Sequence, residues 1–115
     1  MERVSLDDID SRMGPADVNR PVSRALGAED VAINYYELAP GESFAFGYHA
    51  HENQEEIFYV QSGTVTFETE SGDVAVAAGE AVRFAPGEFQ RGVNEGETRV
   101  RALAVGAPQT TGETT

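Results

Sequence analysis

Short apolar runs separated by glycine-containing turn signals recur along this sequence from residue 31 onward. The runs are Val31–Leu38, Ser43–His49, Glu56–Gln61, Thr64–Thr69, Asp73–Ala77, Ala81–Phe84, Phe89–Val93 and Thr98–Val105. Between them stand Pro40–Gly41, Ser62–Gly63, Ser71–Gly72, Ala78–Gly79, Pro86–Gly87 and Asn94–Glu95–Gly96. Runs this short are typical of strands, and glycine supplies the positive φ angle that tight turns need. The sequence therefore predicts an all-β barrel or sandwich.

The two ends of the chain lack this pattern. Ser5–Arg12 can form a short amphipathic turn, and Arg20–Leu26 can form an extra strand on the barrel edge or on a partner subunit. Gly106–Thr115 contains small and polar residues without apolar periodicity, which predicts a flexible tail. We therefore expect an amino-terminal arm over residues 1–30, a β-barrel over residues 31–105 and a tail over residues 106–115.

Length and charge narrow the possible functions. A chain of 115 residues is long enough for one hydrophobic core, so we expect one domain. With 20 acidic and 8 basic residues, its net charge of -12 would repel nucleic acid and anionic membranes. All the basic residues are arginine, so lysine Schiff bases and the lysine of a phosphate-binding loop are excluded. The absence of cysteine excludes thiol nucleophiles, disulfides and thiolate metal sites.

The acidity and the hydropathy pattern also give expectations about the protein's surroundings. Met1–Asp10 has no apolar run of signal-peptide length, and no segment approaches the roughly 18 to 20 apolar residues of a membrane span. We therefore expect a soluble, cytoplasmic protein. An acidic chain without lysine resembles proteins of halophilic microorganisms, whose self-repulsion is screened by concentrated salt. An ordinary acidic protein from a GC-rich genome is the alternative.

The residues with the most obvious chemistry lie between the second and third apolar runs. His49 and His51 are two residues apart, so in an extended strand both imidazoles point to the same side. After a short turn, Glu56 opens the next run and can return its carboxylate to the two rings. Two histidines and one carboxylate suit a divalent transition metal such as Fe, Mn, Ni, Zn, Cu or Co. The alternative is that both histidines are merely solvated at the surface.

A wider pattern favours the metal site. From Pro40–Gly41 through His49, His51 and Glu56 to Gly63, the chain resembles the first conserved motif of the cupin family. The spacing between the glycine and the histidines is two residues longer than usual. The second cupin motif has a counterpart in Gly79, Ala85–Pro86–Gly87, Gln90 and Asn94. The resemblance covers roughly Val31–Val105 and implies a double-stranded β-helix, or jelly-roll, barrel. It also implies one divalent metal ion held inside the barrel and a homodimer.

The resemblance further implies a ligand set with one unusual member. His49, His51 and Glu56 match three metal ligands of the family, whereas Gln90 stands where the fourth ligand is normally histidine. A glutamine amide is a weaker donor than imidazole. Three interpretations stay open: Gln90 is a fourth ligand, it supports metal-bound water through a hydrogen bond, or it marks a site that has lost its metal.

Side-chain alternation predicts what surrounds the ligands. In a regular strand, Ala45 and Gly47 share the face of the histidines, and Phe58 and Val60 share the face of Glu56, so these four residues are expected to line the pocket. Phe44, Phe46 and Tyr48 then form an aromatic stripe on the opposite face, covered by a second subunit or by the arm. Alternatively, a bulge at Gly47 makes these aromatics ordinary barrel core.

Two classes of function are consistent with these features. The first is a metal-dependent enzyme, such as an oxygenase, isomerase or lyase, that acts on a small oxygenated metabolite inside the barrel. The second is a noncatalytic module that binds a metal or small ligand for sensing or sequestration. Because both histidines are assigned to the metal, a separate acid or base would have to be Glu, Asp, Tyr or metal-bound water, and no catalytic residue is identified. A metal-free structural cupin is a third possibility, because of Gln90.

Overall fold

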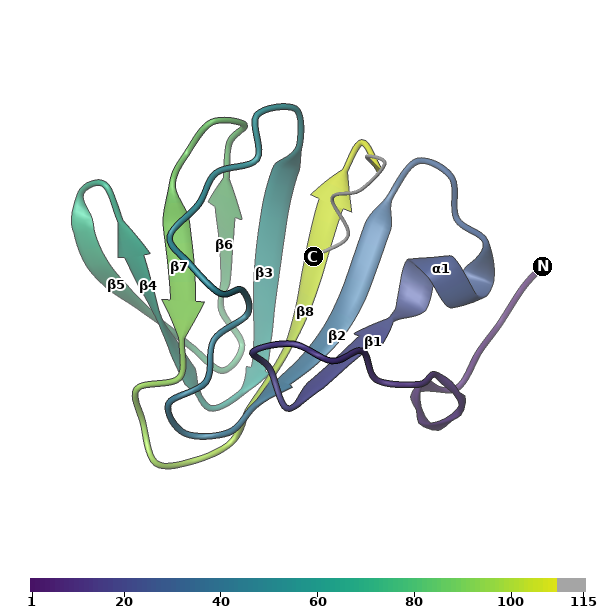
Figure 1. Ribbon diagram of the computed structural model, residues 1–115, viewed down its shortest axis with the longest axis horizontal. Helices are drawn as coiled ribbons and strands as arrows, with labels where there is room; N and C mark the ends of the chain where they lie inside the picture. Colours follow the sequence, from purple (N-terminus) through teal and green to yellow (C-terminus); the bar gives the residue numbers. More distant parts are fainter. Residues whose placement is uncertain (110–115) are drawn as a thin grey trace.

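The computed structural model describes residues 1–109 as two antiparallel sheets that face each other (Figure 1). The helical elements are η1 (Leu6–Asp8) and α1 (Val22–Leu26). The strands are β1 (Val18–Pro21), β2 (Ala32–Leu38), β3 (Glu55–Ser62), β4 (Thr64–Thr69), β5 (Gly72–Ala77), β6 (Ala81–Phe84), β7 (Gln90–Val93) and β8 (Val100–Ala107). The larger sheet has the order β1-β2-β8-β3-β6 and the smaller sheet β5-β4-β7. The predicted all-β jelly-roll class is confirmed. Within the described residues, no helix is long and apolar enough to cross a membrane.

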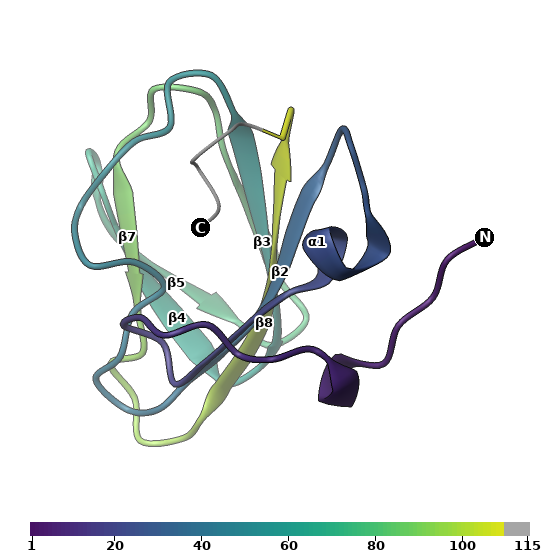
Figure 2. The same ribbon diagram turned by 45° about the vertical axis from the view of Figure 1, so that its right-hand side comes forward.

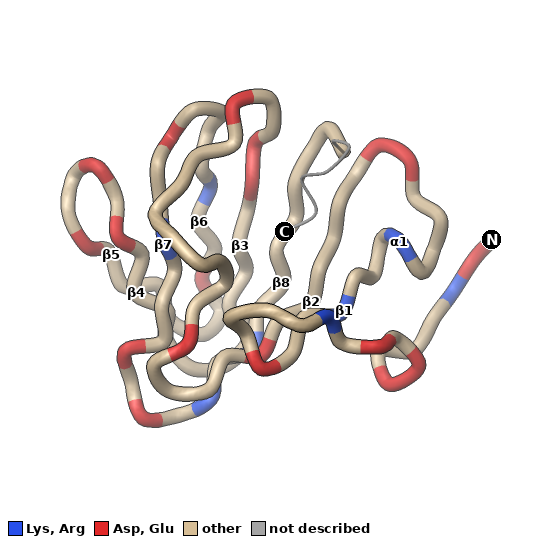
Figure 3. The backbone as a smooth tube through the Cα atoms, viewed as in Figure 1, with Lys and Arg blue, Asp and Glu red and all other residues tan. Residues whose placement is uncertain are grey.

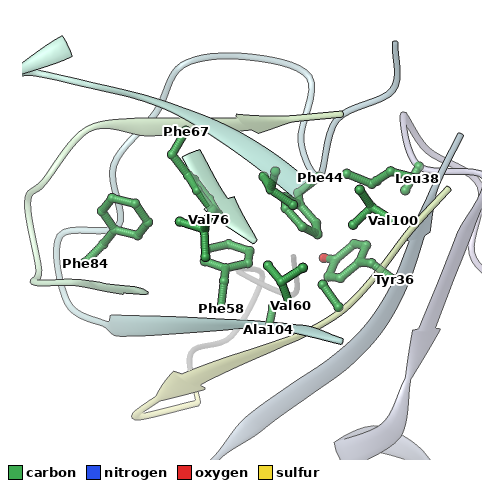
Figure 4. Packing of buried hydrophobic residues seen from close by; sticks show 13 residues of the cluster. Tyr36, Leu38, Phe44, Phe58, Val60, Phe67, Val76, Phe84, Val100 and Ala104 are labelled. Atoms are coloured by element: carbon green, nitrogen blue, oxygen red, sulfur yellow. The ribbon is translucent and has the colours of Figure 1, made fainter. Parts of the chain in front are cut away.

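The hydrophobic core lies between the sheets because successive side chains of each strand point to opposite faces. In β3, Glu56, Phe58 and Val60 are buried, whereas the residues between them are exposed. Five aromatic rings pack edge to face, tilted or stacked within the core (Figure 4): Tyr36, Phe44, Phe58, Phe67 and Phe84. Three of these rings, Tyr36, Phe44 and Phe58, lie next to the candidate ligands.

The segment predicted as the strand Ser43–His49 is not a regular strand. It meets β7 only at two isolated bridges, Ser43 with Val93 and His49 with Gln90. Hydrogen bonds within the segment explain the difference: the Ser43 hydroxyl donates to the carbonyl of Ala45, and the His49 ring bonds the carbonyl of Gly47, both at 2.8 Å. Such local bonds compete with a sheet ladder.

This irregularity divides the aromatic stripe expected on the segment. Phe44 is 7% exposed and belongs to the core, whereas Phe46 is 83% exposed. Tyr48 is partly exposed and stacks on Phe89, with ring centroids 5.5 Å apart. The expectation of one continuous stripe is therefore wrong. The alternative, that these aromatics are core residues, holds for Phe44 alone.

The amino-terminal arm differs from its prediction. Arg20–Leu26 does not form one strand: β1 ends at Pro21, and α1 follows and stops at Gly27, which has a φ of 71°. Proline cannot donate to a further ladder bond, and it suits the start of a helix. Because β1 pairs with β2, part of the arm extends the larger sheet. The expected amphipathic turn over Ser5–Arg12 is reduced to η1.

The carboxyl-terminal boundary also moves. Gly106 and Ala107 belong to β8, which the sequence placed as ending at Val105. Gln109 is held by side-chain hydrogen bonds to the carbonyls of Ala28 and Val31. Residues 106–109 are therefore ordered, contrary to the prediction of a flexible tail. The rest of that predicted tail lies outside the described residues.

Candidate functional site

The four predicted metal ligands come together from three parts of the chain. His49 and His51 lie on the irregular segment, Glu56 lies in β3 and Gln90 begins β7. Two backbone hydrogen bonds join His49 to Gln90, at 3.1 and 2.8 Å. The rings of His49 and His51 have centroids 4.9 Å apart. The sequence spacing thus becomes a cluster in space, because the two bridges hold the irregular segment against β7.

Glu56 is the centre of this cluster. Its carboxylate is buried, with 5% of the residue exposed. The Gln90 side-chain amide donates to Glu56 Oε1 at 3.3 Å, and His51 Nε2 lies 3.8 Å from the same oxygen. A buried carboxylate is costly unless donors or cations surround it. Both Gln90 and His51 are themselves buried, so these contacts lie away from bulk water.

The ring of His49 has a defined tautomer in its neutral form. Its Nδ1 atom lies 2.8 Å from the carbonyl oxygen of Gly47. A carbonyl can only accept, so Nδ1 carries the proton and Nε2 keeps its lone pair. Backbone carbonyls often orient metal-binding histidines in this way. Gly47 therefore contributes to the site through its backbone.

A small cavity adjoins the cluster. It is lined by Tyr36, Phe44, Ala45, His49, Glu56, Phe58, Gln90 and Gly92. The space open to the centre of a water molecule is about 10 Å³, which is room for about one water molecule or ion. Aromatic rings and small residues form most of the wall. Three of the four candidate ligands, His49, Glu56 and Gln90, form its polar end, whereas His51 is not on the wall. A larger ligand would require side chains to move.

Two of the predicted pocket residues do not line this cavity. Ala45 and Phe58 lie on its wall, as their expected faces indicated. Gly47 is not on the wall because the segment around it is not a regular strand. Val60 shares the face of Glu56, but it is fully buried in the hydrophobic core. The pocket residues predicted from strict alternation are therefore corrected at Gly47 and Val60.

The sequence analysis missed three wall residues. Tyr36, on the inner face of β2, could have been found from its alternation with Leu38, since both are buried. Burial raises the pKa of Tyr36, and the nearby Glu56 carboxylate raises it further, so the phenol stays protonated and can donate. The sequence pattern did not indicate Phe44 or Gly92 as wall residues, because their place on the wall depends on how β7 meets the irregular segment.

The donor set fits a divalent transition metal in kind. Imidazole nitrogens and a carboxylate are borderline donors of the type that Fe, Mn, Co, Ni, Cu and Zn accept, and an amide oxygen can complete such a set. The described residues nevertheless contain no group of three His, Cys, Asp or Glu side chains with the geometry to hold a metal ion. In this arrangement Glu56 already bonds Gln90, so metal binding would require the side chains to reorient.

Solved structures of other proteins have a similar fold. The chain is similar to a sugar phosphate isomerase of the cupin superfamily from Silicibacter pomeroyi, with 21% identity, coverage of 94% of this chain and 76% of the other, and a TM-score of 0.83. A predicted oxalate decarboxylase from Thermotoga maritima has 25% identity, covers 94% of this chain and 100% of its own, and has a TM-score of 0.79. A polyketide cyclase from Streptomyces resistomycificus has 23% identity, coverage of 99% and 89%, and a TM-score of 0.75.

A comparison with curated proteins finds no match. A comparison with models of protein families does. The model of the cupin domain matches residues 34–106, which is more than half of the chain and includes all four candidate ligands. The two antiparallel sheets are consistent with that match. The chain therefore belongs to the cupin family.

Proposed function

We propose that this protein is a metal-dependent cupin that binds one divalent transition metal and acts on a small oxygenated metabolite in the barrel. His49, His51 and Glu56 would hold the metal. A bound metal would supply Lewis acidity, and it could polarise an oxygen of the metabolite. The observation that carries the proposal is the buried carboxylate of Glu56, which lies beside His51 and Gln90 at the polar end of the cavity.

Gln90 has a supporting role in this proposal. Its amide nitrogen donates to Glu56, so in this arrangement it orients the carboxylate. Of the three interpretations that the sequence left open, this contact is the one expected of a supporting residue, while the amide oxygen of Gln90 stays available for direct binding. Tyr36 is a protonated phenol on the cavity wall and can donate a hydrogen bond to an oxygen of the metabolite.

The similar structures support the chemical class of the metabolite. Their names refer to a sugar phosphate, oxalate and a polyketide, all of which are rich in oxygen. An oxygen-rich compound suits a site with a metal and a phenolic donor. The three names describe different reactions, so they do not indicate one reaction for this chain.

The size of the cavity favours a second candidate function. Space for about one water molecule suits an ion or water better than a metabolite. A noncatalytic cupin that binds a metal for sensing or sequestration would need no larger space. Both candidate functions use the same metal site. They differ only in whether the protein converts a bound metabolite.

Metal content tests the proposal first. Untagged protein purified in high salt should contain about one equivalent of a transition metal by elemental analysis. The variant His49→Ala/His51→Ala should lose it while circular dichroism shows an intact fold. Glu55→Gln is the matched control, because Glu55 is the neighbouring carboxylate but pairs with Arg83 at the surface. This control should keep the metal.

The outcomes separate the candidates. Protein that takes up none of Mn, Fe, Co, Ni, Cu and Zn on reconstitution would refute the metal site and leave a metal-free structural or binding cupin. If metal is present, oxygen-uptake and substrate screens on sugar phosphates and small oxo acids follow. Turnover lost in the double-histidine variant supports the enzyme. Metal binding without turnover of any of these compounds favours the binding module.

A further inference from the structure

The amino-terminal arm brings an arginine to the inner face of the larger sheet. Arg12 precedes β1, and its Nη2 donates to Oδ1 of Asn34 in β2 at 2.8 Å. Asn34 is 3% exposed and alternates in β2 with Tyr36 and Leu38 of the core, so all three point to the barrel interior. Arg12 itself is half-buried. A cation from outside the barrel thus reaches the inner side of β2.

The arm is held firmly enough to position this arginine. The backbone N–H of Arg12 donates to the carbonyl of Asn19 in β1 at 2.7 Å, and Ala16 is buried in the hydrophobic core. The N–H of Asp17 donates to the carboxylate of Glu42 at 2.9 Å, directly before the irregular segment. Figure 2 shows the chain between η1 and β1 extending toward the smaller sheet. Arg12 is therefore fixed through both its backbone and its side chain.

The register of the larger sheet places the Arg12–Asn34 pair beside the cavity. Tyr36, two residues after Asn34 in β2, lies on the cavity wall, and inner residues spaced in this way are roughly 7 Å apart along a strand. Across the sheet, Asn34 is the partner of Ala104, whose other partner is Phe58, also on the wall. Only the small Ala104 stands between Asn34 and Phe58 in this row. The pair therefore adjoins the wall along the strand and across it.

The charges that act on Tyr36 connect the pair with the candidate ligands. Besides burial, the Glu56 carboxylate raises the pKa of Tyr36, whereas Arg12 lowers it, so both charges lie near the phenol. Arg12 comes from the arm beside β1, and Glu56 comes from β3 on the other side of β2 and β8. The phenol thus has a cation toward the arm and the candidate ligands toward β3.

The surroundings of Arg12 are basic in an otherwise acidic molecule. Burial lowers the pKa of Arg12, and the positive charge of Arg24 in α1 lowers it further. Figure 3 shows basic residues, in blue, at β1 and α1, whereas acidic residues occupy loops at both ends of the strands. With a net charge of -12, most of the surface would repel an anion, but this region would attract one.

The groups gathered here are hydrogen-bond donors. A guanidinium presents five N–H donors in a rigid fork that matches two oxygens of a carboxylate or phosphate. Because the Asn34 amide oxygen faces Arg12, its nitrogen, which carries two further donors, lies on the other branch of the amide. The Tyr36 phenol is a third donor. Since Arg12 is half-buried, an anionic group can bind at the rim while the small cavity receives another part of the same molecule.

We propose that Arg12, together with Asn34 and Tyr36, binds an oxyanionic group, a carboxylate or a phosphate, of the metabolite. This inference rests on the proposed function, because another oxygen of the same metabolite would lie at the metal. It makes the arm part of the binding site and Arg12 a specificity-determining residue. The site then selects anionic metabolites over neutral ones of similar size.

Nuclear magnetic resonance titrations of the full chain, stripped of metal by a chelator and kept at constant ionic strength, test this inference. The probes are malonate, inorganic phosphate and the neutral polyol glycerol. Wild-type protein should bind at least one of the two anions, with a shift of the Arg12 Nε–H signal, and should not bind glycerol. The anion that binds more tightly shows whether the group is a carboxylate or a phosphate.

Three variants locate the binding. Arg12→Gln should weaken anion binding by about 10- to 100-fold, because the charge-assisted fork is lost. Asn34→Asp keeps the size of the side chain but places a carboxylate on the guanidinium, so it should weaken anion binding comparably while the arm stays held. Arg83→Gln is the matched control: it removes one positive charge from a surface ion pair with Glu55 and should bind like the wild type.

Several results would overturn the inference. They are wild-type protein that binds neither anion or binds glycerol equally well, undiminished binding in Arg12→Gln or Asn34→Asp, and an equal loss in Arg83→Gln, which would indicate net charge alone. Circular dichroism checks each fold, and Asn34→Asp decides if Arg12→Gln does not fold. Anion binding by a chain that takes up no metal would refute the proposed function alone. Metal uptake without anion binding would refute this inference alone.

Discussion

Gln90 is the residue of the candidate metal site where the cupin motif normally has histidine. Because its amide orients the carboxylate of Glu56 at 3.3 Å, we expect Gln90→Ala to lower metal affinity by about 10- to 100-fold, as loss of such supporting contacts usually does. Gln90→His should raise the affinity instead, because imidazole is a stronger donor than an amide. Competition with a chromophoric chelator measures both.

The two substitutions at this position also test its role. Glu55→Gln should bind metal like the wild type, since Glu55 faces solvent next to Arg83. If Gln90→Ala binds metal as tightly as the wild type, Gln90 does not support the site. Equal affinity in Gln90→His would show that position 90 is too far from the ion to contribute a ligand.

Gly92 allows the close approach of two aromatic rings beside the cavity. A Cβ atom there would lie 2.7 Å from both Phe44 and Phe67. Overpacking of this kind typically costs about 1–3 kcal/mol, so Gly92→Ala should lower the free energy of unfolding by that amount in urea denaturation. In the control Gly96→Ala the nearest atom would be 3.6 Å away, an ordinary contact, and the change should be small. An unchanged midpoint for Gly92→Ala would contradict the packing described.

At the scale of elements, the turn between β3 and β4 depends on one glycine. Gly63 has a φ of 80°, and a Cβ atom there would lie 2.8 Å from the carbonyl oxygen of Arg99. Gly63→Ala should therefore combine about 1–2 kcal/mol of left-handed strain with a steric clash. Gly41 has a φ of 87° but open space around it, so Gly41→Ala should show the strain alone. Thermal and urea unfolding of Gly63→Ala and Gly41→Ala separate the strain from the clash. An equal loss of unfolding free energy in the two variants would argue against the clash.

Elements bounded by strong local signals could be predicted from the sequence. The observed bounds of β4 and β6 equal those of the predicted runs Thr64–Thr69 and Ala81–Phe84. In both, a positive-φ glycine precedes the strand closely, at Gly63 and Gly79, and marks the turn. Where alternation and turn chemistry agree, local sequence is sufficient.

The irregular segment could not be predicted by the same reasoning. Its apolar residues alternate as in a strand, but bonds from Ser43 and His49 to nearby carbonyls replace most of the ladder. The candidate ligands could still be predicted, because their spacing needs only one return of the chain from His51 to Glu56. The cavity wall could not, because Gly92 reaches it through long-range pairing of β7.

At the scale of the whole molecule, an ion-pair network links the arm to the barrel. Arg99 donates to both Glu37 of β2 and Asp17 of the arm. Burial alone would raise the pKa of Glu37, but hydrogen bonds from Arg99 and Tyr35 outweigh it and leave the pKa lowered. A lowered folded-state pKa means that the ionised form stabilises the fold. This contribution is present above the ordinary pKa of about 4.5 and is lost as the pH falls through the lower, folded-state value.

Glu37→Gln tests this pH dependence. The variant should melt at a lower temperature than the wild type near neutral pH, and the difference should shrink as the pH falls below about 4.5. Differential scanning calorimetry across this range measures it. Glu97→Gln removes an exposed carboxylate from the loop before β8 and should keep the wild-type pH dependence. If the melting temperatures of Glu37→Gln and the wild type differ by the same amount at all pH values, the variant is destabilised by lost packing and not by the lost charge.

Charge over the entire surface gives the last prediction. With a net charge of -12, the folded chain repels itself, and salt shortens the range of that repulsion from about 10 Å at 0.1 M to about 3 Å at 1 M. We therefore expect the melting temperature to rise with sodium chloride at neutral pH. Near the sequence pI of about 4.3 the net charge vanishes, so the same salt should raise the melting temperature little. An equal rise at both pH values would mean that salt acts through apolar burial and not through screening. Such a result would remove the physical basis for expecting a halophilic origin, because repulsion between the carboxylates would then not destabilise the folded chain, and concentrated salt would have no repulsion to screen.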